Sequence, residues 1–77
     1  MSTLVRAFRF LQELGGEATK KRLAKHAREH DPNDSLSDPR TVSRSMWRLH
    51  RSGLVDYEDR PNRGAGTERV WKVKPNT

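Results

Sequence analysis

Residues 37–54 read SDPRTVSRSMWRLHRSGL, and their pattern predicts a helix with two chemically opposite faces. At about 100° per residue, the arginines share an arc of roughly 80°, while Val42, Met46 and Leu49 fall together on the other side. No acidic residue lies between the first and the last arginine, so the polar face is cationic throughout. The arginines are Arg40, Arg44, Arg48 and Arg51. This helix is expected to bury its apolar face and to present the other face to a polyanion.

The same stretch carries signals for both ends of the helix. Ser37 or Asp38 can cap its start, and Pro39 suits the first helical position, where a backbone N–H would have no partner. Gly53 can adopt the left-handed conformation that commonly ends a helix. We therefore expect a helix over about residues 38–52.

Two further helices are expected before it. Leucines at helical spacing predict the first, over about residues 3–14, and the glycines that follow stop it. Phe10 widens the apolar arc of this helix, so its ring either packs in the core or forms a dimer contact. A short extended connector then leads to Thr19, which can cap a second helix over about residues 20–30.

The hydrophobic period changes after the glycine at position 53. Residues 54–59 and 67–73 alternate between apolar and polar side chains, and a loop rich in Gly, Pro and Asn separates them. This pattern predicts an antiparallel β-hairpin with a long tip. Arg69 is expected to pair with Asp56 or Glu58 across the strands.

Composition favours a small basic protein with one domain over residues 1–77. Sixteen Lys and Arg against ten Asp and Glu give a net charge of +6, which suits nucleic acid or an anionic membrane surface. Without cysteine, disulfides and thiolate chemistry are excluded. No apolar run approaches the ~20 residues that span a bilayer. Arginines interrupt the apolar N-terminal stretch, unlike in a signal peptide, so we expect a cytoplasmic protein without membrane contact.

Residues 41–55, TVSRSMWRLHRSGLV, resemble the recognition helix and helix exit of winged-helix transcription regulators of the MarR and ArsR type. Those families often carry the pattern T-V-S-R-x-L-x-x-L-x-x-x-G-L-V, from which only Met46 departs, by a volume-conserving swap. Residues 16–27 resemble their connector and second helix, whereas the loop over residues 31–38 is longer than usual. The resemblance covers about residues 4–74. It implies an α+β, mainly α fold: a three-helix winged helix-turn-helix with a C-terminal two-stranded β-hairpin wing.

The resemblance also implies a function and its residues. The expected activity is double-stranded DNA binding by a small transcriptional regulator whose helix 38–52 reads the major groove. The residues nearest the bases are Arg40, Thr41, Ser43 and Arg44, with Arg48 and Arg51 nearer phosphate. The 60–66 wing would touch the adjacent minor groove or backbone through Arg60 and Arg63. The candidates for further backbone contacts are Lys20 and Lys21.

Other functions stay open at this point. A winged helix also serves as a protein-interaction or assembly module in transcription or replication complexes. RNA binding is a third alternative, although the chain lacks an obvious aromatic platform for single strands. Trp47 lies beside the arginines and has three interpretations: covering the core, stacking on DNA, or burial in a homodimer.

Catalysis and metal binding are not expected. His26 and His30 lie one helical turn apart, but Asp31 is the only obvious third ligand nearby, so we expect no metal. No nucleophile with a base and an orienting group is apparent, and no glycine-rich phosphate loop opens a helix. We therefore expect neither an enzyme nor a cofactor.

Overall fold

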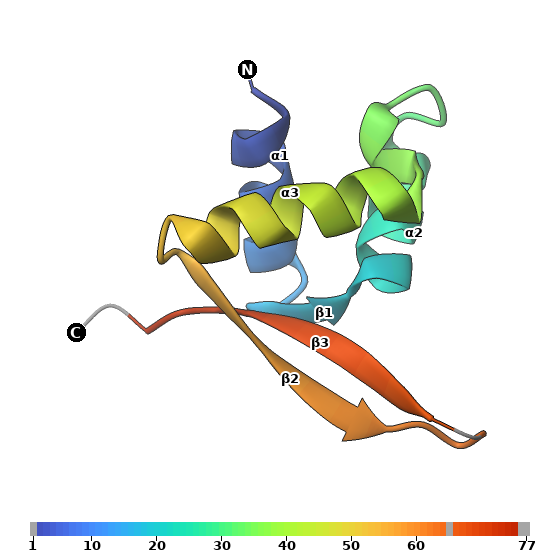
Figure 1. Cartoon of the computed structure of the whole chain (residues 1–77). Coiled ribbons are helices and arrows are strands. Elements are labelled where there is room, and N and C mark those ends of the chain that lie inside the picture. The colour runs from blue at the N-terminus through green and yellow to red at the C-terminus, as the bar shows by residue number, and fades with distance from the viewer. Residues whose placement is uncertain (1, 65, 76–77) are drawn as a thin grey trace.

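The computed structural model describes residues 2–64 and 66–75. Three helices lie over a small antiparallel sheet, so the chain is α+β and mainly helical (Figure 1). The helices are α1 (Thr3–Glu13), α2 (Lys20–His30) and α3 (Pro39–Arg51), with a short 3₁₀ helix, η1 (Ser35–Ser37), before α3. The strands are β1 (Glu17–Thr19), β2 (Val55–Pro61) and β3 (Thr67–Val73). No helix in this described part of the chain is long and apolar enough to cross a membrane.

The three helices form where the sequence predicts them, because their end signals are local. The side chain of Ser2 accepts a hydrogen bond from the backbone at the start of α1, and Thr19 does the same for α2. Asp38 caps α3, and Pro39 occupies its first turn. Gly53 follows α3 with φ of +81°, a left-handed conformation that glycine adopts without strain.

The predicted hairpin is confirmed as β2 and β3, but the expectation of only two strands is wrong, because the sheet has three strands in the part of the chain that the structure describes. The connector at residues 17–19 forms β1, which pairs antiparallel with β3 and gives the strand order β1-β3-β2. In this register Trp71 of β3 lies between Ala18 of β1 and Tyr57 of β2. Three residues are too few to show an alternating pattern, and their partner strand lies near the other end of the chain.

The core lies between the helices and the sheet. The long loop over residues 31–38, before α3, packs against this core. Leu36 of η1 is buried, and Asp34 beside it forms an ion pair with Arg6 of α1. The guanidinium of Arg28 donates to the backbone oxygen of Ser37 at 3.3 Å. Phe10 is buried in the core, in agreement with the core-packing interpretation of its ring. The largest fully buried side chains are Trp71, Leu11, Leu23, Leu36 and Met46.

Candidate functional site

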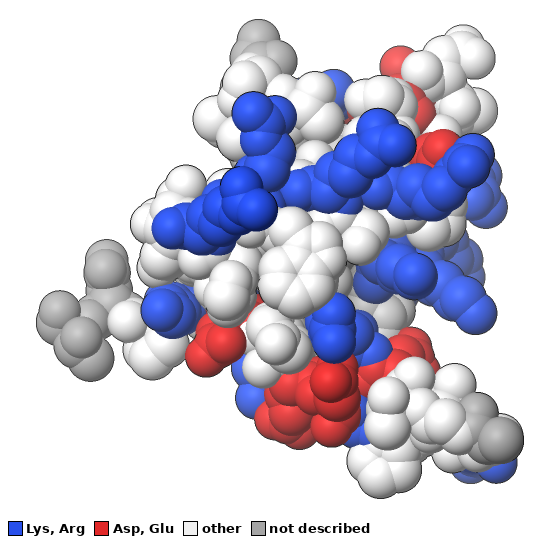
Figure 2. All heavy atoms as spheres, in the orientation of Figure 1, with Lys and Arg blue, Asp and Glu red and all other residues white. Residues whose placement is uncertain are grey.

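The arginines of α3 form an exposed row along one side of that helix. Arg44, Arg48 and Arg51 are exposed, and no carboxylate among residues 2–64 and 66–75 forms an ion pair with them. Arg40 is 87% exposed and lies 3.6 Å from the Asp38 carboxylate, a distance at which a surface ion pair contributes little. Figure 2 shows basic side chains running along α3. The row therefore keeps most of its positive charge available to a ligand.

A cleft lies on each flank of the arginine row. Thr41 is half-buried and lines a cleft of about 350 Å³ between α3 and the first residues of α1, together with Arg44 and Arg48. Ser43 is also half-buried and lines a cleft of about 400 Å³ between α3, the start of α2 and the hairpin. The two hydroxyl residues expected near the bases thus lie on opposite sides of the row.

The two lysines at the start of α2 line the same cleft as Ser43. Lys20 and Lys21 are exposed in the first turn of α2 and line the larger cleft. Asp59 and Glu68 of the hairpin form part of its other wall. Figure 2 shows this contrast, with basic residues over α2 and an acidic patch over the hairpin. Arg69 lines the same wall and forms an ion pair with Asp59. The cleft is therefore positive on its helical side and carries both signs of charge on its sheet side.

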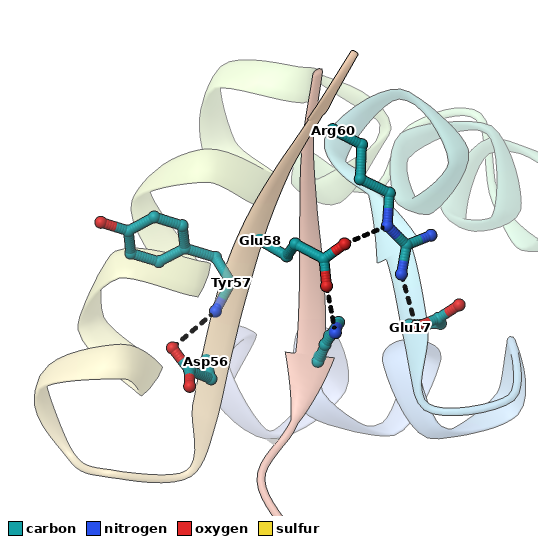
Figure 3. Close-up of polar contacts among 6 residues, drawn as sticks. Glu17, Asp56, Tyr57, Glu58 and Arg60 are labelled. Carbon is teal, nitrogen blue, oxygen red and sulfur yellow. Dashed lines mark hydrogen bonds and ion pairs between the residues drawn. The ribbon is translucent and has the colours of Figure 1, made fainter. Parts of the chain in front are cut away.

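Arg60 lies apart from the arginine row. Its guanidinium donates to Glu58 at 2.7 Å and to Glu17 of β1 at 3.3 Å (Figure 3). Successive strand residues point to opposite faces, so Glu58 and Arg60 lie on the face opposite Tyr57. The Tyr57 ring packs 5.3 Å from Trp47 of α3. Arg60 therefore points away from α3, with its charge already compensated, although the sequence grouped it with the other candidate residues.

Arg63 is the other hairpin residue that the sequence analysis assigned to DNA contact. It is exposed near the tip, and its backbone N–H donates to the Asn62 side chain at 2.8 Å. Within the described residues its side chain forms no ion pair. The loop 60–66, as expected from the sequence, also includes Ala65, which lies outside the described residues.

Trp47 joins α3 to the sheet. Its ring meets Trp71 edge-on at 5.0 Å and Tyr57 at 5.3 Å between centroids, geometries that aromatic pairs prefer. The guanidinium of Arg69 lies over Trp47 at 5.0 Å. Trp47 nevertheless keeps 39% of its surface exposed. It therefore covers the core on one side and leaves a surface beside the arginine row.

The cross-strand partner predicted for Arg69 is wrong. Arg69 pairs with Asp59, at 2.9 and 3.3 Å, rather than with Asp56 or Glu58. The register places Asp59 directly opposite Arg69, and Glu58 opposite Val70. The alternating pattern indicated two strands, but the register that selects partners depends on the turn and on packing.

Glu58 is the centre of a charged network on the outer face of the sheet. Hydrogen bonds from Lys72, at 2.6 Å, and from Arg60 lower the pKa of Glu58 to about 2 from its ordinary 4.5. A carboxyl with a depressed pKa stabilises the fold fully above its unfolded pKa, and this contribution is lost as pH falls toward the folded value.

We expect the midpoint of thermal unfolding to fall as pH decreases from about 5 to about 2, and to fall less steeply in Glu58→Gln. Thermal unfolding followed by circular dichroism at several pH values measures both slopes. Parallel slopes in the two proteins would show that Glu58 does not carry the pH dependence.

A second polar cluster lies where α1 meets α2. The Glu13 carboxylate lies 2.8 Å from Nε2 of His26 and 3.9 Å from Nε2 of His30. The hydrogen bond to His26 is the main cause of a lowered pKa at Glu13. Glu13, rather than Asp31, is thus the third potential metal ligand beside His26 and His30. Sequence spacing could not indicate this ligand, because Glu13 belongs to another helix and joins the histidines only through packing.

Comparisons with protein-family models, curated proteins and solved structures found no match to this chain. The resemblance of residues 41–55 to winged-helix regulators therefore remains a prediction.

Proposed function

We propose that the chain is a double-stranded DNA-binding protein of the winged helix-turn-helix class that acts as a small transcriptional regulator. The observation that carries the proposal is the exposed arginine row of α3, of which three members have no acidic partner among the described residues. The major groove of B-DNA is about 12 Å wide and admits an α-helix. In a helix-turn-helix, the N-terminal part of the recognition helix contacts base edges.

The proposed contacts follow from position along α3. Arg40 and Arg44, near its start, are assigned to base edges, where arginine binds guanine bidentately. Arg48 and Arg51, further along, are assigned to phosphates, as are the exposed Lys20 and Lys21 at the start of α2. Thr41 and Ser43 flank the arginines and supply hydroxyl contacts to bases or phosphates.

The hairpin is proposed as a wing that contacts DNA only near its tip. Glu68 lies on the wall of the larger cleft and disfavours phosphate there, while Asp59 on the same wall is already paired with Arg69. Arg63 is the tip residue assigned to the minor groove or backbone. Arg60 is left out of the interface, since Glu58 and Glu17 already bind it.

A second candidate function is a protein-interaction or assembly module. The exposed part of Trp47 favours it, because tryptophan is enriched at the centres of protein interfaces. In that case the protein would associate with itself or another protein without DNA, and DNA would bind weakly and regardless of sequence. Sedimentation of the protein with and without duplex DNA separates the two functions.

Titration with duplex DNA at several salt concentrations tests the leading proposal. If the protein neutralises about six phosphates, log K should fall against log salt with a slope of about −5. Selection of bound oligonucleotides from a random duplex pool then reports any sequence preference. Absence of binding at about 50 mM salt would rule out the proposal, because nonspecific contacts are strong under that condition.

A further inference from the structure

Glu13, His26 and His30 bring three potential metal ligands together at the crossing of α1 and α2. One atom from each, a carboxylate oxygen or an imidazole nitrogen, lies within 4.8 Å of the others. The histidines are one turn apart on α2 and so share a helical face. Glu13, the last residue of α1, approaches that face from the neighbouring helix.

The spacing of these atoms suits a small transition-metal ion. Zinc bonds to histidine and carboxylate measure about 2.0–2.2 Å, so tetrahedral ligands lie about 3.3 Å from one another. The observed separations of 2.8 and 3.9 Å from Glu13 to the two histidines bracket that value. The three ligand atoms lie within 4.8 Å of one another, so side-chain rotations that bring them closer would let an ion enter in place of the Glu13–His26 hydrogen bond.

Phe10 holds both imidazole rings in place. Its buried ring stacks on His30, with centroids 5.4 Å apart and planes inclined by 15°, and it meets His26 edge-on at 5.1 Å. Rings already held by packing lose less conformational freedom when a ligand binds. An apolar support of this kind also lowers the local dielectric around a metal.

The cluster is open to solvent on one side. The side chains of Glu13 and His30 are 42% and 56% exposed, whereas that of His26 is 20% exposed. An ion can thus enter directly, and a water molecule can occupy a fourth position. Two histidines with one carboxylate and an open position are a set that zinc adopts in proteins.

We propose that Glu13, His26 and His30 bind one Zn²⁺ or a similar borderline divalent transition-metal ion, which links α1 to α2. Imidazole ligands favour such ions, whereas Ca²⁺ and Mg²⁺ prefer oxygen ligands throughout. The site is separate from the arginine row of α3, and the proposal does not depend on DNA binding.

Calorimetric titration of the untagged chain with zinc chloride tests the proposal. We expect one zinc ion per chain, with affinity reduced about 100-fold or more in Glu13→Gln, His26→Gln and His30→Gln, because even outer-shell substitutions cost about 10–100-fold. The matched controls are His50→Gln and Glu29→Gln, which remove the same side-chain types outside the cluster. Both should bind zinc like the unaltered protein.

Thermal unfolding gives a second readout that is independent of the titration. Zinc at about 100 times its Kd should raise the unfolding midpoint by about 10 °C or more, and only in proteins that retain all three ligands. Unfolding without zinc establishes that each variant is folded. Absence of zinc binding in the unaltered protein, or equal binding in the cluster and control variants, would overturn the proposal.

Discussion

Trp71→Ala is expected to remove about 3–5 kcal/mol from the free energy of unfolding, the usual cost of truncating a large buried aromatic side chain. Trp71 is only 1% exposed and occupies the central strand of the sheet. Its ring packs against Trp47 of α3 and Tyr57 of β2. Its removal therefore leaves a cavity where the helices and the sheet meet.

This loss would be a large share of the protein's stability. At roughly 0.05–0.15 kcal/mol per residue, a chain of 77 residues is stabilised by about 4–12 kcal/mol. Urea unfolding followed by far-ultraviolet circular dichroism measures the change without depending on tryptophan fluorescence. If a substantial fraction of Trp71→Ala is unfolded at room temperature, the stability of the unaltered protein lies in the lower part of that range.

Trp47→Ala is the matched control, because it removes the same side chain from a partly exposed position. With 39% of Trp47 already in solvent, we expect a smaller loss of about 1–2 kcal/mol. Equal losses in the two variants would mean that Trp71 does not dominate the junction between α3 and the sheet.

Arg44→Ala is expected to have the largest effect on DNA recognition. If Arg44 binds a guanine, its removal costs about 1–3 kcal/mol at that base pair, which is about 5–150-fold in affinity for the preferred sequence. Affinity for unrelated sequences should change less. Competition titrations with the selected site and a scrambled duplex measure this discrimination.

Two further variants separate the roles of the cations. Lys21→Ala should weaken binding to all sequences alike and reduce the salt slope by about 1, as expected for a phosphate contact. Arg60→Gln should leave both affinities unchanged, since Arg60 is bound by Glu58 and Glu17 on the far face of the sheet. If Arg44→Ala binds DNA as well as the unaltered protein, the start of α3 does not contact the bases as proposed. If Arg60→Gln loses affinity strongly, the middle of the hairpin does contact DNA.

Local patterns were enough to predict the helices and the hairpin. Caps at Thr19 and Asp38 and the glycine at 53 act on residues next to them, so the helix ends can be read without knowledge of the fold. The arginines of α3 could be grouped for the same reason, since helical geometry places them on one face. The hairpin was visible because its strands are long enough to show alternation.

Contacts between segments far apart in the sequence could not be predicted from these local patterns. β1 forms because β3 offers it an edge, and three residues have no pattern of their own. The strand register paired Arg69 with Asp59 and placed Arg60 beside Glu58 and Glu17, which separates Arg60 from α3. The crossing of α1 and α2 likewise brought Glu13 to the histidines.

The sequence by itself thus determined the helices, the hairpin and the grouping of four arginines on one face of α3, because each depends on residues within a few turns of one another. Only the tertiary structure decided which charges remain available and which are bound. Whether a charged side chain is free depends on carboxylates that packing brings from other segments. For that reason the arginines of α3 stay open to a ligand while Arg60 and Arg69 are held within the sheet.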